Sequence, residues 1–353
     1  ILTSRVFGIP IMIGLLGIIF WLTVVGANYP SQLLSKGLFW LGDRINDFLI
    51  YVDCHDTVRD MIVNGIYKVL AWVVSVMLPP MAIFFPLFTL LEDLGYLPRI
   101  AFNLDKYFRR SGACGKQALT MAMGFGCNAA GVTGCRIIDS PRERLIAILT
   151  NNFVPCNGRF PSLISIITMF FTASAAGAMR SGLSALILLV VILGGVLMTL
   201  FVSWILSKTV LKGVPSSFAL ELPPYRKPQI GKVIVRSIFD RTIFVLGRAC
   251  AVAAPAGLLI WCLANFTVSG ETILYHLSEF LQPLGNILGM DGVILLGFIL
   301  GFPANEIVIP VIIMCYMSSG TIMEMENMHA LKLLLTDNGW NWVTALCTMI
   351  FIL

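Results

Sequence analysis

Two cysteines and one glutamate stand out because each lies in a polar break within a long apolar segment. Cys127 lies in the run GFGCNAAG, Cys156 in NNFVPCNGRFP and Glu306 in GFPANE. Soft thiolate sulfur together with amide and carboxylate oxygens suits a borderline first-row metal such as Fe(II) better than Na⁺ or Mg²⁺. A carboxylate inside an apolar segment is costly and is a functional candidate by default. These residues therefore predict a polar site for a cation.

Each of these residues also has a structural explanation. A cysteine in an apolar chain packs as a small hydrophobe, and Glu306 can serve a structural hydrogen bond. Arg159, in the same run as Cys156, can balance Glu306, bind a carbonyl or extend to the membrane interface. The run Asp53-Cys54-His55-Asp56 is too tightly spaced for one metal site on a regular element, so an ordinary surface loop is favoured over a weak capture site. The run MEMENMH (323–329) is interpreted in the same way.

The composition is that of an integral membrane protein. The 353 residues are 58% hydrophobic and 12% charged, whereas soluble domains carry about 25% charged residues. The net charge of +5 comes mostly from a few basic loops and indicates no nucleic-acid partner. The nine cysteines include no CxxC pair, and there is no GxxxxGK[ST], Ser-His-Asp or HExxH pattern. The chain is therefore expected not to be an enzyme.

Four apolar runs are long enough to cross a bilayer, which takes about 20 residues. They cover about Ile9 to Asn28, Ile66 to Leu91, Leu183 to Leu206 and Thr242 to Phe266. Ser31 to Ile50 has apolar residues at helical spacing and could lie on the membrane surface. The chain starts in a juxtamembrane stretch and ends in a short apolar run, so it is interpreted as a fragment of a longer protein.

The distribution of Lys and Arg predicts the orientation of these segments. The basic stretches 92–116, 136–144 and 207–241 should be cytoplasmic, and 29–65, 267–291 and 319–341 should be external loops. Segment 117–135 then has cytoplasmic loops on both sides and is expected to enter the membrane and return. Segment 292–318 is expected to do the same from the opposite face, although it is long enough to span.

The two broken segments share a short similar core, and each follows a proline-containing span of opposite direction. This pattern is typical of an inverted-topology repeat. The predicted fold is all-α, a polytopic membrane helical bundle with two inverted repeats that contain broken or re-entrant helices. The predicted parts are a first span with an external amphipathic region (1–65), repeat 1 (66–173), a span with a basic cytoplasmic linker (174–241) and a C-terminally truncated repeat 2 (242–353).

Four runs together resemble the membrane domain of the ferrous iron transport protein B (FeoB) family. They are LEDLGYLPRIAFNLDKYFRRSGACGK (91–116), GFGCNAAGVTGCRIIDSPRERL (124–145), NNFVPCNGRFP (151–161) and GFPANEIV (301–308). The resemblance covers essentially the whole chain. It implies two "gate" repeats around a metal path, with Cys127, Cys156 and Glu306 as metal ligands. The implied ion pathway consists of Cys127, Asn128, Cys156, Asn157, Arg159, Asn305 and Glu306.

Two departures from the family pattern put the finer details of the ligand set in question. Asn305 stands where the family usually has Lys, and Ala129-Ala130 stands where many members have Val-Pro.

The resemblance also implies cargo, partners and location. Fe(II) would be the transported ion, and GTP with Mg²⁺ would bind only in a cytoplasmic GTPase domain that would precede Ile1. Beyond the lipid bilayer, candidate partners are that domain, a small cytoplasmic accessory protein and further copies of the chain. The location would be a bacterial inner or plasma membrane, multi-pass, with a cytoplasmic N-terminus beside Arg5.

Two other functions stay open on the sequence. One is a permease for a polar organic solute such as a nucleoside, which would not need the cysteines. The other is a non-transporting gate-domain membrane protein, and the intramembrane acid Glu306 argues modestly against it.

Overall fold

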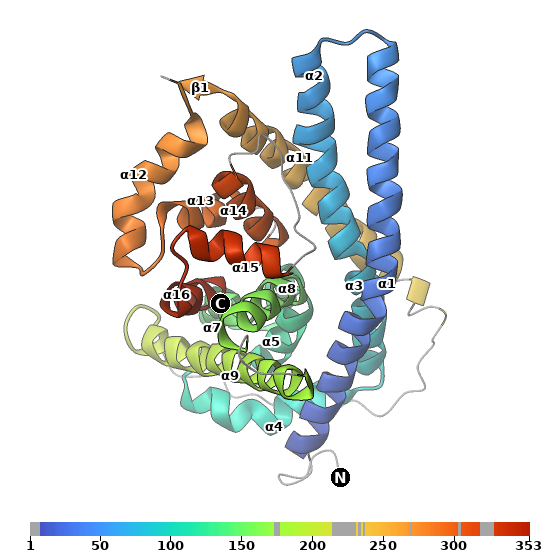
Figure 1. The fold of residues 1–353 in the computed structure, drawn as a ribbon. Helices are drawn as coiled ribbons and strands as arrows, with labels where there is room; N and C mark the ends of the chain where they lie inside the picture. Colours follow the sequence, from blue (N-terminus) through green and yellow to red (C-terminus); the bar gives the residue numbers. More distant parts are fainter. Residues whose placement is uncertain are drawn as a thin grey trace.

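Helices make up nearly all of the computed structural model, which describes residues 8–172, 177–213, 231, 234–235, 237–268, 270–302, 305–317 and 328–353 (Figure 1). The predicted linker over 214–230 and the run 323–327 lie outside the described residues. The first half of the chain contains α1 (Gly8–Tyr51), α2 (Asp56–Asp60), η1 (Met61–Tyr67), α3 (Lys68–Asp93), α4 (Tyr96–Arg110), α5 (Lys116–Gly126), α6 (Asn128–Gly134), η2 (Cys135–Ile137), α7 (Pro141–Thr150), η3 (Asn151–Phe153), η4 (Asn157–Arg159), α8 (Phe160–Ile166), η5 (Ile167–Phe171) and α9 (Gly177–Lys208).

The second half continues the helical architecture with one minimal hairpin of strands, β1 (Thr267–Val268) paired antiparallel with β2 (Glu271–Thr272). Its helical elements are η6 (Ser237–Ile243), α11 (Phe244–Asn265), α12 (Ile273–Ile287), α13 (Gly292–Leu300), η7 (Asn305–Ile307), α14 (Val308–Met317), α15 (Met328–Asp337) and α16 (Trp342–Ile352). Segments η1, η5 and η6 are π-helical, and η2, η3, η4 and η7 are single 3₁₀ turns.

Three of the helices in the described ranges are long and apolar enough to cross a membrane. They cover Asp56–Leu91, Gly182–Lys208 and Ser237–Asn265, which confirms three of the predicted spans. The pair α12 and α13 would make a fourth, but it is bent by 108° at its break, as in a broken span or a re-entrant loop. The span expected over about 9–28 is not among these and stays a prediction.

Two stretches that the sequence suggested as surface segments or loops are built differently. Residues 31–50 form no separate surface helix, because α1 runs unbroken to Tyr51 and packs along α3. The Tyr67 hydroxyl fixes this contact by donating a hydrogen bond of 2.8 Å to the carbonyl of Leu38. The stretch 267–291, expected to be an external loop, consists mostly of the β1–β2 hairpin and the helix α12.

The helices α4 and α12 show that the chain contains a structural repeat. Each has 15 residues, and every position in α4 corresponds to one in α12 that lies 177 positions later. Each helix is followed by a left-handed glycine at the equivalent position, Gly112 and Gly289, both with φ of 74°. Only glycine adopts this conformation without cost, so it ends both helices in the same way.

The turn after each of these helices is closed by the same hydrogen bond. The carboxylate of Asp105 accepts from the backbone N–H of Gly115 at 2.9 Å, and the amide oxygen of Gln282 accepts from the N–H of Gly292 at 2.8 Å. Both partners are again displaced by 177 positions. The bond links each amphipathic helix to the start of the broken helix that follows it. The two units therefore share their hydrogen bonding as well as their order of elements.

The repeat extends to the π-helical segments, through which the two copies pack reciprocally. Both η1 and η6 have seven residues and lead directly into the long helix of their own copy, α3 or α11. Each π segment packs against the long helix of the other copy, η1 on α11 and η6 on α3. Glycines allow the closest approach, because a Cβ at Gly257 of α11 would collide with the carbonyl oxygen of Gly65 in η1. This reciprocal packing is that of a pseudo-two-fold interface.

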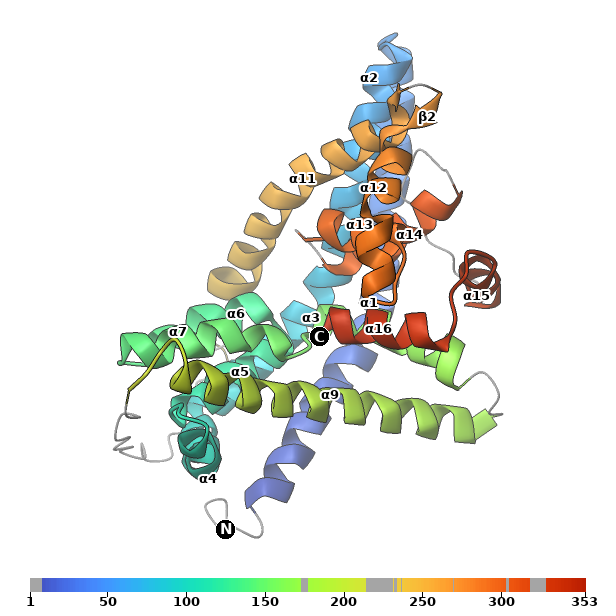
Figure 2. The ribbon, with the colours of Figure 1, turned by 90° about the vertical axis from the view of Figure 1, so that its left-hand side faces the viewer.

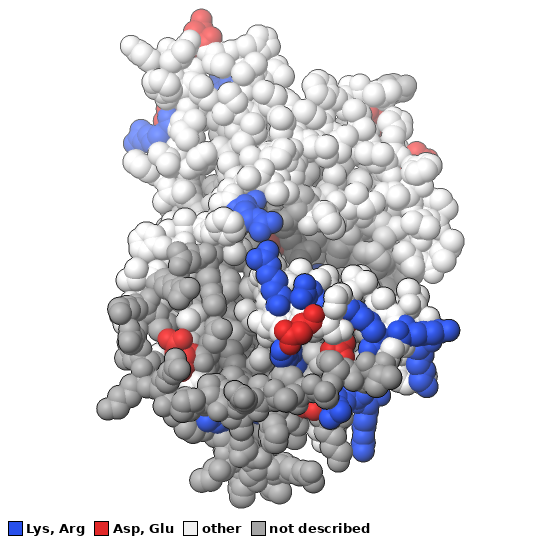
Figure 3. Space-filling view, turned by 180° about the vertical axis from the view of Figure 1, so that it is seen from behind, with Lys and Arg blue, Asp and Glu red and all other residues white. Residues whose placement is uncertain are grey.

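The two copies run in opposite directions. Figures 1 and 2 show α3 descending from α2 at the top toward α4, whereas α11 rises toward the β1–β2 hairpin at the top. Seen from behind, most Lys and Arg gather in the lower half of the molecule, at the end that carries α4 (Figure 3). The basic stretch that carries α4 thus lies at the opposite end from the stretch 29–65, whereas α15, in the non-basic stretch 319–341, lies at mid-height in Figures 1 and 2.

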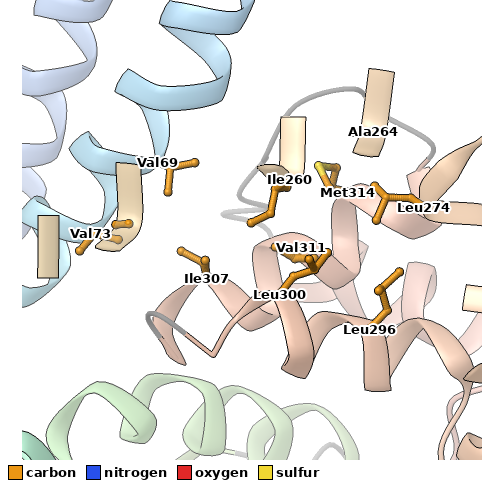
Figure 4. Packing of buried hydrophobic residues seen from close by; sticks show 11 residues of the cluster. Val69, Val73, Ile260, Ala264, Leu274, Leu296, Leu300, Ile307, Val311 and Met314 are labelled. Atoms are coloured by element: carbon orange, nitrogen blue, oxygen red, sulfur yellow. The ribbon is translucent and has the colours of Figure 1, made fainter. Parts of the chain in front are cut away.

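A buried apolar cluster beside η7 joins the two copies (Figure 4). It brings two valines of α3 against side chains of the second copy, and its fully buried members include Val73, Ile260, Ile307 and Val311. Between membrane helices such clusters stabilise through van der Waals packing rather than through removal from water. The cluster anchors η7, the turn that carries Glu306, against α3.

Candidate functional site

The first predicted break is confirmed as a single extended residue between two helices. Cys127, with φ of −154° and ψ of 120°, separates α5 from α6 and is 8% exposed. Its sulfur makes no hydrogen bond that caps the start of α6. The break is pressed against α3, because any Cβ at Gly126 would collide with the ring of Phe84. Glycine at 126 is therefore a packing requirement of the site.

The second cysteine lies in an irregular segment between α7 and α8. After the turn η3 the chain extends through Val154 and Pro155, and it turns again at η4 directly after Cys156. The N–H of Arg159 donates to the carbonyl of Cys156 at 2.9 Å and closes this second turn. Cys156 is half-buried.

The third break brings Glu306 to the turn that follows Cys156. Helix α13 ends at Leu300, residues 303 and 304 lie outside the described part, and η7 leads into α14. The turns η4 and η7 are neighbours, and the Glu306 carboxylate lies directly against the backbone of Gly158. Gly158 belongs to the turn η4, which also contains Arg159 and directly follows Cys156, so the acid lies beside this segment. The breaks of both repeats thus meet in one site.

Arg159 is held in place by hydrogen bonds rather than extended toward the membrane interface. Its guanidinium donates to the carbonyl of Asn152 at 3.0 Å, to the side-chain oxygen of Asn152 at 3.2 Å and to the carbonyl of Leu353 at 3.0 Å. It adds positive charge beside Glu306 without being among the direct ion pairs found in the described part of the chain. Of the roles considered from the sequence, carbonyl binding is therefore seen, and charge balance with Glu306 stays a prediction.

The remaining predicted pathway residues differ in what the structure says of them. Asn128 turns its side chain toward the carbonyls of Asn151 and Val154. With its amide assigned so that the nitrogen faces these carbonyls, it donates to them at 3.3 and 3.2 Å and so serves the backbone around the site. The side chains of Asn157 and Asn305 lie outside the described part. The His55 ring accepts the N–H of Thr57 at 3.3 Å and caps α2, as expected for a surface loop.

A ready-made metal centre is not seen among the described residues. No group of three or more His, Cys, Asp or Glu side chains in the described ranges converges closely enough to hold an ion. The ligand set Cys127, Cys156 and Glu306 stays a prediction. The pattern analysis missed Asn151, Asn152 and Gly158 as functional positions. Their only sequence signal is that they lie in the same broken run as Cys156.

Two protein-family models match parts of this chain. The family model "Gate: Nucleoside recognition" matches residues 74–170, and "Ferrous iron transport protein B C terminus" matches residues 188–240. The "Fe(2+) transporter FeoB" of Staphylococcus aureus (strain COL) is 30% identical over 331 residues, which cover 90% of this chain and 48% of that protein. That of Campylobacter jejuni is 26% identical over 341 residues, 93% of this chain and 53% of that protein.

A third relative, from Porphyromonas gingivalis, is named "Fe(2+) transport protein A/Fe(2+) transporter FeoB fusion protein". It is 31% identical over 287 residues, which cover 81% of this chain and 32% of that protein. The chain spans about half the length, or less, of these curated relatives. No solved structure matches it significantly.

An all-helical bundle with a gate module and broken helices that meet at one polar site defines a polytopic gate-domain membrane protein. The chain belongs to the FeoB family, and it represents the gate-bearing membrane region of that family.

Proposed function

We propose that this chain forms the membrane path through which a ferrous iron uptake protein passes Fe(II). The observation that carries the proposal is the meeting of the Glu306 carboxylate with the turn after Cys156, which brings the breaks of the two repeats together. Two sulfurs and a carboxylate suit Fe(II), which accepts both soft and hard donors. The relatives named Fe(2+) transporters support the same cargo.

The incomplete convergence of the ligands fits a path better than a storage site. A conducting site must bind its ion strongly enough to admit it and weakly enough to release it. Cys127 belongs to one repeat and Glu306 to the other, so relative motion of the repeats would open or close the ligand set. The reciprocal packing of η1 and η6 offers an interface for such motion.

We propose that the full-length protein joins this membrane region to a cytoplasmic domain. We place GTP and Mg²⁺ in a cytoplasmic domain joined to it, the N-terminal end of α1 on the cytoplasmic side, and the bundle in a bacterial inner or plasma membrane. The fusion named in Porphyromonas gingivalis supports a small accessory protein as a partner.

The test is ⁵⁵Fe uptake by full-length protein in proteoliposomes, measured for Cys127→Ser and Cys156→Ser. Both changes should lower uptake at least about tenfold, because each removes a soft donor. The matched control is Cys262→Ser, on α11 and away from the breaks. Unchanged uptake in the Cys127→Ser/Cys156→Ser double variant would remove the thiols from the mechanism.

A second candidate cargo is a nucleoside, because the gate model that covers residues 74–170 is described by nucleoside recognition. This function predicts that uridine competes for transport and that the cysteine variants keep full activity. Uptake of ⁵⁵Fe that is insensitive to excess uridine would reject this alternative.

A further inference from the structure

The Asn151 side chain lies between α5 and α6, next to the break at Cys127. Asn151 is the first residue of η3 and is 3% exposed. A Cβ at Gly124 would lie 2.6 Å from its Oδ1, and a Cβ at Gly131 would lie 2.6 Å from its Nδ2. The asparagine amide therefore fills the gap between α5 and α6, and the two helices can flank it only because both contact positions are glycines.

The same amide belongs to a pair of asparagines that links both cysteine segments. Asn151 Nδ2 donates to the carbonyl of Asn128 at 3.3 Å. With the Asn128 amide assigned in the orientation that satisfies its surroundings, its nitrogen donates back to the carbonyls of Asn151 and Val154 at 3.3 and 3.2 Å. Asn128 follows Cys127 directly, and Val154 lies two residues before Cys156. The pair thus links the chain next to Cys127 to the chain next to Cys156.

Stability alone does not explain an asparagine at position 151. Its Oδ1 is buried without a hydrogen-bond partner among the described residues. A buried unpaired acceptor destabilises a protein, whereas an apolar group of the same shape can be neutral or stabilising. Leucine has nearly the shape of asparagine and would avoid this cost. What leucine lacks is the amide donor that holds Asn128.

We propose that Asn151 is a positioning residue that, through Asn128, sets the separation of the Cys127 and Cys156 thiols and so the affinity of the site for thiophilic cations. This inference rests on the proposed function. It assigns to Asn151 no contact with the ion. Residues that orient metal ligands from behind typically change metal affinity by about 10- to 100-fold when they are replaced.

The test uses Cd(II) as the probe and full-length protein in detergent. Cd(II) binding is followed by the ultraviolet absorption of Cd–thiolate bonds, which reads the thiols whether or not iron is transported. Asn151→Leu should weaken Cd(II) binding by at least about tenfold while the thermal midpoint stays unchanged or rises. Asn338→Leu, at an exposed position at the end of α15, is the control and should bind Cd(II) as the parent does.

A second set of variants keeps the test decisive if Asn151→Leu folds poorly. Gly124→Ala should weaken Cd(II) binding by itself, since the three atoms nearest to its Cβ all belong to the Asn151 amide. In the double variant Asn151→Ala/Gly124→Ala that amide is gone, so binding should be no weaker than in Asn151→Ala alone. Losses that simply multiply would show that the amide does not fill this gap, and the inference would then be wrong.

The outcomes separate this inference from the proposed function. Asn151→Leu with parental Cd(II) affinity, while Cys127→Ser and Cys156→Ser lose it, overturns the positioning role and leaves the iron path intact. Cysteine variants that retain full ⁵⁵Fe uptake overturn the iron path, even where Asn151→Leu still weakens Cd(II) binding.

Discussion

The carboxylate of Glu306 lies so close to the backbone of Gly158 that any side chain at position 158 would collide with it. These two residues are far apart in the sequence and belong to the breaks of different repeats. Gly158 sits in the turn between Cys156 and Arg159, so its lack of a side chain lets the acid lie directly against this turn.

Gly158→Ala should displace the Glu306 carboxylate and lower ⁵⁵Fe uptake by about 10- to 100-fold, because small displacements of a ligand weaken the site strongly. The protein should still fold, since the added methyl group lies in a turn rather than in the apolar core. The control is Gly182→Ala on α9, whose Cβ meets nothing within 4 Å. Equal uptake by the two variants would contradict the proximity of Glu306 to this turn.

Glu306→Gln keeps the shape of the side chain and removes its charge. We expect uptake to fall at least about tenfold, since a neutral amide binds a divalent cation far less well than a carboxylate does. Thermal unfolding should change little or rise, because a buried charge no longer has to be held away from water. A variant that transports iron normally would leave Glu306 with a structural role only.

Gly257→Ala tests the contact between the two repeats. Its Cβ would meet the carbonyl oxygen of Gly65 and lie 2.9 Å from Cβ of Val69. Overpacking of this kind costs about 1–3 kcal/mol, so the thermal midpoint in detergent should fall. Gly247→Ala on the same helix meets nothing within 4 Å and should be neutral or stabilising, since alanine favours a helix. A similar midpoint for both variants would mean that η1 and α11 are not closely packed.

Asp105→Ala and Gln282→Ala remove equivalent bonds in the two repeats. Each leaves the N–H of a helix start, at Gly115 or Gly292, without its acceptor and should cost about 1 kcal/mol. Comparable falls in thermal midpoint are expected. Glu279→Ala, at an exposed position of α12, should change the midpoint little. A loss confined to one of the two variants would show that the two turns are not equivalent.

Much of the fold could be predicted because the bilayer imposes simple rules on a sequence. Long apolar runs gave three confirmed spans, and the clusters of glycine, proline and polar residues marked the breaks at Cys127, Cys156 and Glu306. The opposite charge of the flanking stretches indicated the inverted repeat. These signals are local, so they can be read without knowing which segments touch.

What the sequence could not show depends on contacts between distant segments. The amide of Asn151 acquires a role only because Gly124 and Gly131 flank it, and nothing in the run NNF marks it. Asn128 looked like an ion ligand because it follows Cys127, yet tertiary packing directs its side chain to backbone carbonyls. The continuous helix α1 was missed because polar residues near Ser31 suggested an end that its packing on α3 overrides.

The matched hydrogen bonds of Asp105 and Gln282 also show that equivalent positions of the two units differ in charge. The two units have the same acceptor position and the same turn. The chemical identity of the acceptor followed the surroundings. Asp105 lies beside Arg109 at the basic end, 3.9 Å from its guanidinium, whereas the stretch around Gln282 contains no Lys or Arg. The two units thus share one geometry, while the charge of the acceptor differs between the two ends of the molecule.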